Sequence, residues 1–351
     1  MKVTRRSAWI VGALAFLPLA GCESTTGPGE FDPVVTADAM AEMQVAGEEV
    51  GEAFAGLALA GNLFAGSGAQ LMLPTAEHGV MMDVATARAY ADPAVAADFF
   101  PSNYLGVTFV WNFAEEGYVA SDEPGAPEDG IRVVYYAVDP FTHMPAEPLT
   151  ALGRIDLRDL STAASQRLGI AIVRTAGEDD VTLADYFLDA SYTATETSFG
   201  VRQIADGYLS DGAARLDFEL VNEMDLNEEQ LILDQSYEMS LAGTDIGVAY
   251  EGTFTGDWET EAGTAEIAAT VTGNGTSVRF ELAVDAEEML TGSVYHGSEL
   301  VATISGTGDE PVFTNAATGE PLTAEQLEAL AEIFRAVEGL FELAEGIFPA
   351  V

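Results

Sequence analysis

Apolar residues recur with two different periods along the chain, and the two changes of period divide the chain into three parts. Over residues 36–64 they recur at alternating spacings of three and four, which places them on one stripe of an α-helix. From Leu105 the spacing becomes two, the period of a strand with one buried face. After residue 323 the helical spacing returns and continues to residue 348. The pattern predicts a β region between two helical segments.

The β region consists of short alternating runs separated by turn residues. In the first run, 105–114, Val107, Phe109 and Trp111 alternate with other residues, as expected for a half-buried strand. We expect about a dozen strands with no helix between them. Because parallel neighbours need long crossovers, this order predicts an antiparallel meander. The other alternating runs span residues 131–138, 168–174, 181–188, 214–221, 231–241, 278–284 and 300–305.

The two faces of the predicted strands differ in polarity. In the run that ends at residue 221, Arg215, Asp217 and Glu219 alternate with leucine and phenylalanine, so one face contacts water. We predict a mainly β fold with flanking α: an antiparallel meander that forms a sandwich or an open half-barrel, with both amphipathic helices packed on it. A membrane-spanning barrel has the same alternation, but the charged residues and helical ends argue against one.

Each helical segment has a second possible role. In the N-terminal one, residues 53–76 carry no charge, so lipid contact is an alternative to burial in a core. In the C-terminal one, Thr323 and Gln326 have the spacing of a capping box. The wide apolar face that follows is typical of a helix docked on its own domain, and the alternative is contact with a partner or a lipid.

The beginning of the chain has the order of a cleaved export signal. Lys2, Arg5 and Arg6 precede an apolar run, residues 8–17, that is too short to span a bilayer. After Pro18, the four residues Leu19-Ala20-Gly21-Cys22 resemble the lipobox of bacterial lipoproteins. This resemblance implies cleavage before Cys22, a diacylglyceryl thioether on its sulfur, and usually a third acyl chain, such as palmitate, on the new amino group. Two or three chains anchor a protein durably.

The resemblance implies an exported, lipid-anchored protein of the bacterial cell envelope, and we favour the outer membrane over the inner. The predicted organisation is a signal peptide (1–21), a flexible tether (22–35), an N-terminal helical segment (36–104), an antiparallel β domain (105–314) and a C-terminal amphipathic helix (315–351).

Charge and cysteine content exclude several classes of function. The chain has 13 basic and 58 acidic residues, and three basic residues lie in the signal, so the cleaved chain has 10 against 58 and a net charge of −48. Such a surface repels nucleic acid and anionic head groups. Cys22 is the one cysteine of the sequence, so its lipidation leaves no thiol for catalysis or for a disulfide.

No histidine or serine motif indicates catalysis. His78, His143 and His296 are far apart in sequence and none belongs to a paired ligand motif. An enzyme would therefore require His143 or His296 to meet acidic residues in one cleft. We expect a protein without enzymatic activity and without a cofactor.

Carboxylates are the abundant reactive groups. Asp257, Glu259 and Glu261 are spaced two apart and would share one face of a strand, where Ca²⁺ could relieve their repulsion. The alternative is a solvated acidic edge. Elsewhere, Arg154, Asp156 and Arg158 share a strand face and predict a row of salt bridges.

The predicted anchor and domain favour one class of function. We expect a lipid-anchored envelope protein that binds an apolar, lipid-like ligand or an envelope protein partner, with the membrane contacted through the anchor and no contact with nucleic acid. The alternatives are a structural or adhesive envelope protein and, after it, a hydrolase or a protein that depends on a divalent cation. Because the fold alone does not define function, this expectation is an analogy with tethered lipoproteins.

Overall fold

The computed structural model describes most of the predicted β domain. It covers residues 99–331 apart from 138, 140, 141, 143, 163, 164, 177, 178, 196, 211, 228, 229, 257–262, 274, 308, 309, 325, 328 and 329. The predicted signal peptide, the tether, the helical stripe at residues 36–64 and Cys22 lie outside the described residues. So does most of the predicted C-terminal helix.

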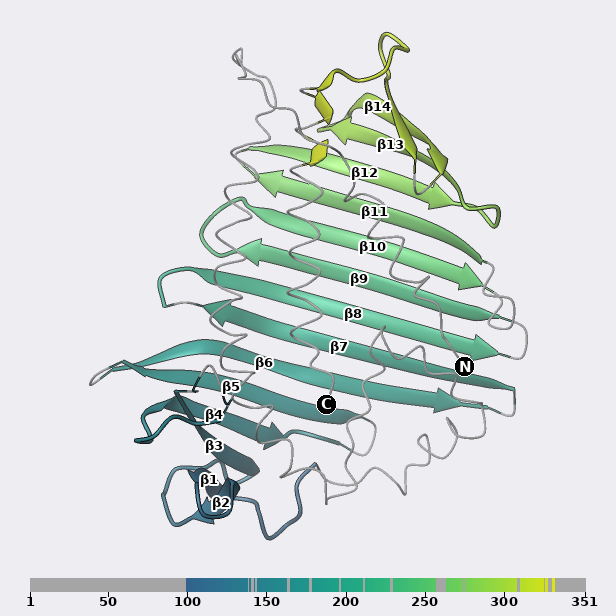
Figure 1. Cartoon of the computed structure of the whole chain (residues 1–351). Helices are drawn as coiled ribbons and strands as arrows, with labels where there is room; N and C mark the ends of the chain where they lie inside the picture. The colour runs from purple at the N-terminus through teal and green to yellow at the C-terminus, as the bar shows by residue number, and fades with distance from the viewer. Residues whose placement is uncertain are drawn as a thin grey trace. The chain divides into compact units, whose positions relative to one another are not determined.

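The described residues form fifteen strands, whose order can be followed by colour from blue at β1 to yellow-green at β14 (Figure 1). The fold is thus mainly β, as predicted. The strands are β1 (Val107–Asn112), β2 (Gly117–Ser121), β3 (Gly130–Tyr136), β4 (Ala151–Asp159), β5 (Gln166–Ala176), β6 (Asp179–Ala194), β7 (Ser198–Ser210), β8 (Arg215–Asn227), β9 (Leu231–Leu241), β10 (Gly247–Gly256), β11 (Gly263–Gly273), β12 (Thr276–Val284), β13 (Met289–His296), β14 (Glu299–Thr307) and β15 (Pro311–Asn315).

Hydrogen bonds join these strands into one sheet in the order β15-β14-β13-β12-β11-β10-β9-β8-β7-β6-β5-β4-β3-β1-β2. From β3 to β15, spatial neighbours are also neighbours in sequence, which is the connectivity of a meander. The end strands β15 and β2 are not neighbours in this order, so the sheet of described strands is not closed. The chain forms two compact units that divide β8 between Glu219 and Leu220. We call residues 99–219 the first unit and residues 220–331 the second unit.

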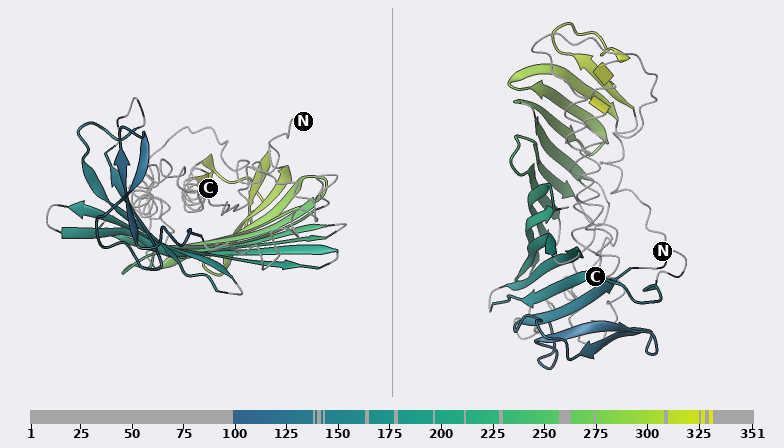
Figure 2. Two further views of the ribbon diagram at one scale, coloured as in Figure 1. Left: turned by 90° about the horizontal axis from the view of Figure 1, so that it is seen from below. Right: turned by 90° about the vertical axis from the view of Figure 1, so that its left-hand side faces the viewer.

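One pair of strands in the first unit departs from the predicted antiparallel pairing. β1 pairs antiparallel with β2 but parallel with β3, where Val107, Thr108 and Phe109 lie opposite residues 131–133. The segment 122–129 between β2 and β3 is long enough to bring the chain back past β1, so β3 begins beside the start of β1. The blue strands of this part of the chain lie at one end of the sheet (Figure 2). The prediction of an entirely antiparallel meander was therefore wrong at this pair.

The core of the first unit is one apolar row that crosses the sheet. Val133, Ile155, Ile172 and Ala184 lie opposite one another on β3 to β6, and each is fully buried. The row ends on β7 at Leu209, which is also fully buried. Since opposite residues point to the same face, this face is apolar and the other face carries the charged residues.

The second unit repeats this arrangement from β9 to β15. Tyr250, Ala269, Phe280, Val294 and Ala302 lie opposite one another on β10 to β14, and all five are buried. All strand pairs from β9 to β15 are antiparallel, as predicted.

The last strand is followed by a segment that turns back along it. The main-chain N–H of Leu322 donates to the oxygen of Phe313, and the N–H of Asn315 donates to the oxygen of Glu320. Thr323 and Gln326 then make both hydrogen bonds of a capping box, N–H of Gln326 to Oγ1 of Thr323 at 3.3 Å and N–H of Thr323 to Oε1 of Gln326 at 3.0 Å. The predicted capping box is confirmed, whereas the helix that it would begin stays a prediction.

No helix among the described residues is both long enough and apolar enough to cross a membrane.

Candidate functional site

Most residues singled out from the sequence lie outside the described part of the chain. These are Cys22, His78, His143 and the acidic triplet Asp257, Glu259 and Glu261. His296 is described and half-buried at the end of β13, opposite Val278 of β12. Within the described residues, no three or more His, Cys, Asp or Glu side chains lie close enough together to hold a metal ion. The Ca²⁺ site remains a prediction.

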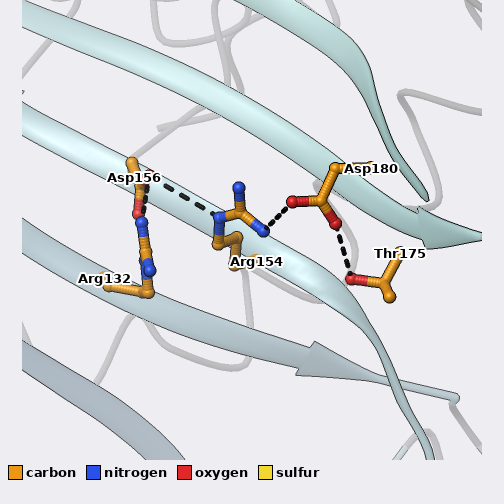
Figure 3. Close-up of polar contacts among 5 residues, drawn as sticks. All are labelled: Arg132, Arg154, Asp156, Thr175 and Asp180. Atoms are coloured by element: carbon orange, nitrogen blue, oxygen red, sulfur yellow. Dashed lines mark hydrogen bonds and ion pairs between the residues drawn. The ribbon is translucent and has the colours of Figure 1, made fainter. Parts of the chain in front are cut away.

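The predicted row of salt bridges is present on the charged face of the first unit. Asp156 lies between two arginines, accepting from Nε and Nη2 of Arg132 at 2.6 and 2.8 Å and lying 3.9 Å from Nε of Arg154 (Figure 3). Arg154 also donates to Asp180 at 2.7 Å, and Asp180 accepts from the hydroxyl of Thr175 at 3.3 Å. We call these five residues the charged row. Arg158, the third predicted member, pairs with Asp129 at 2.7 Å instead.

These contacts favour the charged forms of Arg132, Asp180 and Asp129. The two hydrogen bonds with Asp156 raise the pKa of Arg132 above its ordinary value. The hydrogen bond from Arg154 lowers the pKa of Asp180, and that from Arg158 lowers the pKa of Asp129. The side chains of Arg132 and Asp156 are 19% and 18% exposed, so this pair is the most enclosed of the row.

Other arginines of the first unit are held in the same manner. The guanidinium carbon of Arg167 lies 3.8 Å from the ring centre of Phe187, and its Nε lies 3.2 Å from Asp189. Arg215 likewise covers the ring of Tyr208 and pairs with Asp217. Because these cations already have carboxylate and aromatic partners, we assign this face to structure rather than to ligand binding.

The charged face of the second unit has a different composition. Between residues 220 and 331, Arg279 is the one arginine or lysine in the sequence. It pairs with Glu281 at 3.0 Å and lies over the ring of Tyr295. The remaining positions of this face are mainly threonine, serine, alanine and carboxylates, as in the row Ser236, Glu251, Ala268, Glu281, Ser293, Thr303 and Thr314.

The apolar face of the second unit carries three polar side chains that bond to one another. Nε2 of Gln235 donates to Oδ1 of Asn222 at 3.2 Å and to the hydroxyl of Tyr237 at 2.8 Å. The Tyr237 hydroxyl donates to the same Oδ1 atom at 3.0 Å. We call Asn222, Gln235 and Tyr237 the polar triad. All three are half-buried, in contrast to the fully buried row of the first unit.

Aromatic stacking positions the triad. The ring of Tyr237 stacks on that of Tyr250 at 5.4 Å between centroids and 25° between planes. The Tyr250 ring extends over Gly252, where a Cβ atom would lie 2.5 Å from its hydroxyl oxygen. Burial raises the pKa of Tyr250, so its hydroxyl is protonated at neutral pH.

Half-buried apolar side chains adjoin the triad on the same face. Met224 is two residues beyond Asn222 on β8, and Leu233 is two residues before Gln235 on β9. Phe254 of β10 lies opposite Leu233. We call Met224, Leu233 and Phe254 the apolar rim. The arrangement can bind a molecule that has a polar end for the triad and an apolar part for the rim.

Comparison with protein families, with curated proteins and with solved structures found no match to this chain.

The triad was not among the sites predicted from the sequence, although the sequence contains a signal for it. Asn222 and Gln235 occupy positions that the alternation assigns to the apolar face of two successive strands. These strands are joined by a tight turn, in which Asn227 bonds to Gln230. Asn222 precedes Asn227 by the same number of residues as Gln235 follows Gln230, so antiparallel pairing brings the two amides together. Neither residue was a candidate for catalysis or metal binding, because both side chains are neutral and neither is a nucleophile.

Proposed function

We propose that this protein is a lipid-anchored protein of the bacterial envelope that binds an apolar ligand on the half-buried face of its second unit. The anchor is Cys22, and the outer membrane is the favoured location. The bound molecule is held by the polar triad and the apolar rim, without a chemical reaction. In this proposal the sheet is an open half-barrel, and the two predicted amphipathic helices pack on the part of its apolar face that the ligand does not occupy.

The polar triad is the observation that carries the binding role. A buried hydrogen-bonding group that is incompletely paired costs about 1–3 kcal/mol, so natural apolar faces rarely contain one without a purpose. The triad contains two amides of this kind, Asn222 and Gln235, which are half-buried among half-buried apolar side chains. A ligand that covers the rim removes this apolar area from water, at about 25 cal/mol per Å².

The anchor is supported by the order of the first residues. Basic residues, a short apolar run and the lipobox-like Leu19–Cys22 follow one another as in lipoprotein signals. Growth of a bacterium expressing the full chain with an alkyne-modified palmitate tests the attachment. We expect label on the wild type and on the tether variant Ser24→Ala and no label on Cys22→Ser. Label retained by Cys22→Ser would contradict the assignment.

Ligand binding is tested by titrating the full chain carrying Cys22→Ser with dodecan-1-ol below its solubility limit. We expect saturable binding by calorimetry. Leu233→Ser should weaken it about tenfold, because removing a side chain of this size from an apolar contact costs about 1.5–3 kcal/mol. The matched control is Ile232→Ser, which alters the neighbouring half-buried residue on the opposite face. Equal losses in both variants, or no binding by the parent protein, would refute the proposed site.

The free edge of β2 favours a second candidate function, adhesion or assembly by strand addition. β2 is the last strand of the sheet and pairs with β1 alone among the described strands. Such an edge can accept an extended segment of another chain. Self-association of the full chain that is lost in Val119→Pro would support this candidate, because proline removes a main-chain donor from β2.

A further inference from the structure

We propose that the polar triad selects amphiphiles whose head group is uncharged and carries both a hydrogen-bond donor and an acceptor, such as a fatty amide. This inference rests on the proposed function and specifies the ligand of the same site. Two observations carry it: the hydrogen-bonding atoms that Asn222 and Gln235 leave available, and the charge of the face around them.

The triad uses only part of its hydrogen-bonding capacity internally. Oδ1 of Asn222 accepts two bonds and Nε2 of Gln235 donates two. Nδ2 of Asn222 and Oε1 of Gln235 have no hydrogen-bond partner among the described residues. An amide nitrogen donates and an amide oxygen accepts, so Asn222 offers a donating group and Gln235 offers an accepting group. A primary amide on the ligand carries both the acceptor that Asn222 lacks and the donor that Gln235 lacks.

The surrounding face disfavours either charge on the ligand. Its side chains on β9 to β12 are neutral; the one arginine of this unit, Arg279, lies on the opposite face with Glu281. An anionic head would lose water without gaining a cation, and the acidic surface of the protein would repel it. A cationic head would find no carboxylate on these strands of the apolar face. Both charged heads therefore pay a desolvation cost that a neutral head avoids.

Three ligands with the same chain length test this selectivity. Dodecanamide, dodecanoate and dodecylamine are each titrated into the full chain carrying Cys22→Ser at pH 8, below their micelle concentrations. At this pH the acid is ionised and the amine is protonated. We expect dodecanamide to bind at least about tenfold more tightly than dodecanoate, since two neutral hydrogen bonds contribute about 0.5–1.5 kcal/mol each.

Variants separate the triad from the rest of the surface. Gln235→Leu and Asn222→Leu should each lower the affinity for dodecanamide about tenfold and change that for dodecanoate less than threefold. The control is Thr253→Val, which removes a hydroxyl that donates to Asp234 on the opposite face of β10 and β9. It should leave all affinities unchanged. Circular dichroism of each variant verifies that the sheet is retained.

The outcomes distinguish the inference from the function on which it rests. If dodecanoate binds as tightly as dodecanamide, or if the triad variants lose both ligands equally, the selectivity for a neutral head is refuted and apolar binding stands. If dodecylamine binds most tightly and Thr253→Val binds it equally well, the acidic surface rather than the triad recognises the head, which also refutes the inference. If none of the three ligands binds, the proposed function itself fails.

Discussion

Strands β3 to β5 of the first unit and β9 to β11 of the second unit are built on the same plan, but their side chains are enclosed to different degrees. In both, a tyrosine ring lies over a glycine on the apolar face, Tyr135 over Gly153 and Tyr250 over Gly252. Near Gly153 on the apolar face, the side chain of Ile155 is fully buried. Around Gly252 the facing residues include the half-buried polar triad.

The charged faces differ in the same sense. β3 to β5 carry arginine–carboxylate pairs that satisfy one another, whereas β9 to β11 carry carboxylates and hydroxyls without an arginine. Paired and enclosed groups stabilise a fold, and incompletely paired, half-exposed groups remain available to a ligand. This difference supports the proposed binding role of the second block of strands and a stabilising role of the first.

The largest difference between the two blocks is expected in the unfolding free energy lost when each of these glycines is replaced by alanine. In Gly153→Ala the new methyl group would collide with the main-chain oxygen of Val173 and lie 2.7 Å from the hydroxyl of Tyr135. In Gly252→Ala the three atoms nearest to the new methyl group all belong to the side chain of Tyr250, which can shift. We expect a loss of about 3 kcal/mol in unfolding free energy for Gly153→Ala and about 1 kcal/mol for Gly252→Ala, measured by urea denaturation.

Ligand affinity should show the reverse order. A shift of the Tyr250 ring in Gly252→Ala displaces Tyr237, on which it stacks, and with it the triad. Gly153→Ala leaves the triad untouched and should bind dodecanamide as the parent protein does under native conditions. Equal destabilisation by both substitutions would remove the distinction between the enclosed block and the open one.

A smaller difference in unfolding free energy is expected when one carboxylate on the charged face of each block is replaced by an amide. Asp156→Asn leaves Arg132 with an amide in place of its carboxylate, and because this pair is four-fifths buried we expect a loss of about 1–2 kcal/mol in unfolding free energy. Glu251→Gln alters an exposed residue opposite Ser236 and Ala268, and should change stability by less than about 0.5 kcal/mol. Thermal unfolding of both variants at low salt checks the contrast. A loss of similar size at Glu251 would show that its carboxylate is paired.

Alternation in the sequence predicted the strands whose apolar positions carry large side chains. β9 begins and ends at the predicted residues, Leu231 and Leu241. β10 and β11 escaped the analysis because small residues such as Gly252 and Ala269 occupy apolar-face positions and weaken the period. The parallel pair of β1 and β3 could not be predicted, since pairing between distant segments leaves no local signal.

Side-chain partners across strands were predictable only in part. Arg154 and Asp156 are two residues apart, so their shared face followed from the strand period, but Arg132 and Asp180 come from other strands and depend on register. The same limit applied to the triad, because Asn222 and Gln235 meet through the register of β8 and β9. Sequence alone gives the face of a residue, and the neighbour on that face depends on the pairing.

The smallest expected effect is a pH dependence in the charged row. The hydrogen bond from Arg154 lowers the pKa of Asp180 in the folded protein, so the pair contributes stability above the unfolded-state pKa of about 3.9 and loses it as pH falls through the folded-state value. The melting temperature of the parent protein should therefore exceed that of Asp180→Asn by a constant amount from pH 6 to pH 5. This difference should shrink to zero at lower pH.

Thr175→Val removes only the weaker contact to Asp180 and should keep most of the pH-dependent difference. A difference between parent and Asp180→Asn that persists unchanged to pH 2.5 would mean that asparagine disturbs packing, and that the charge pair with Arg154 adds nothing to stability.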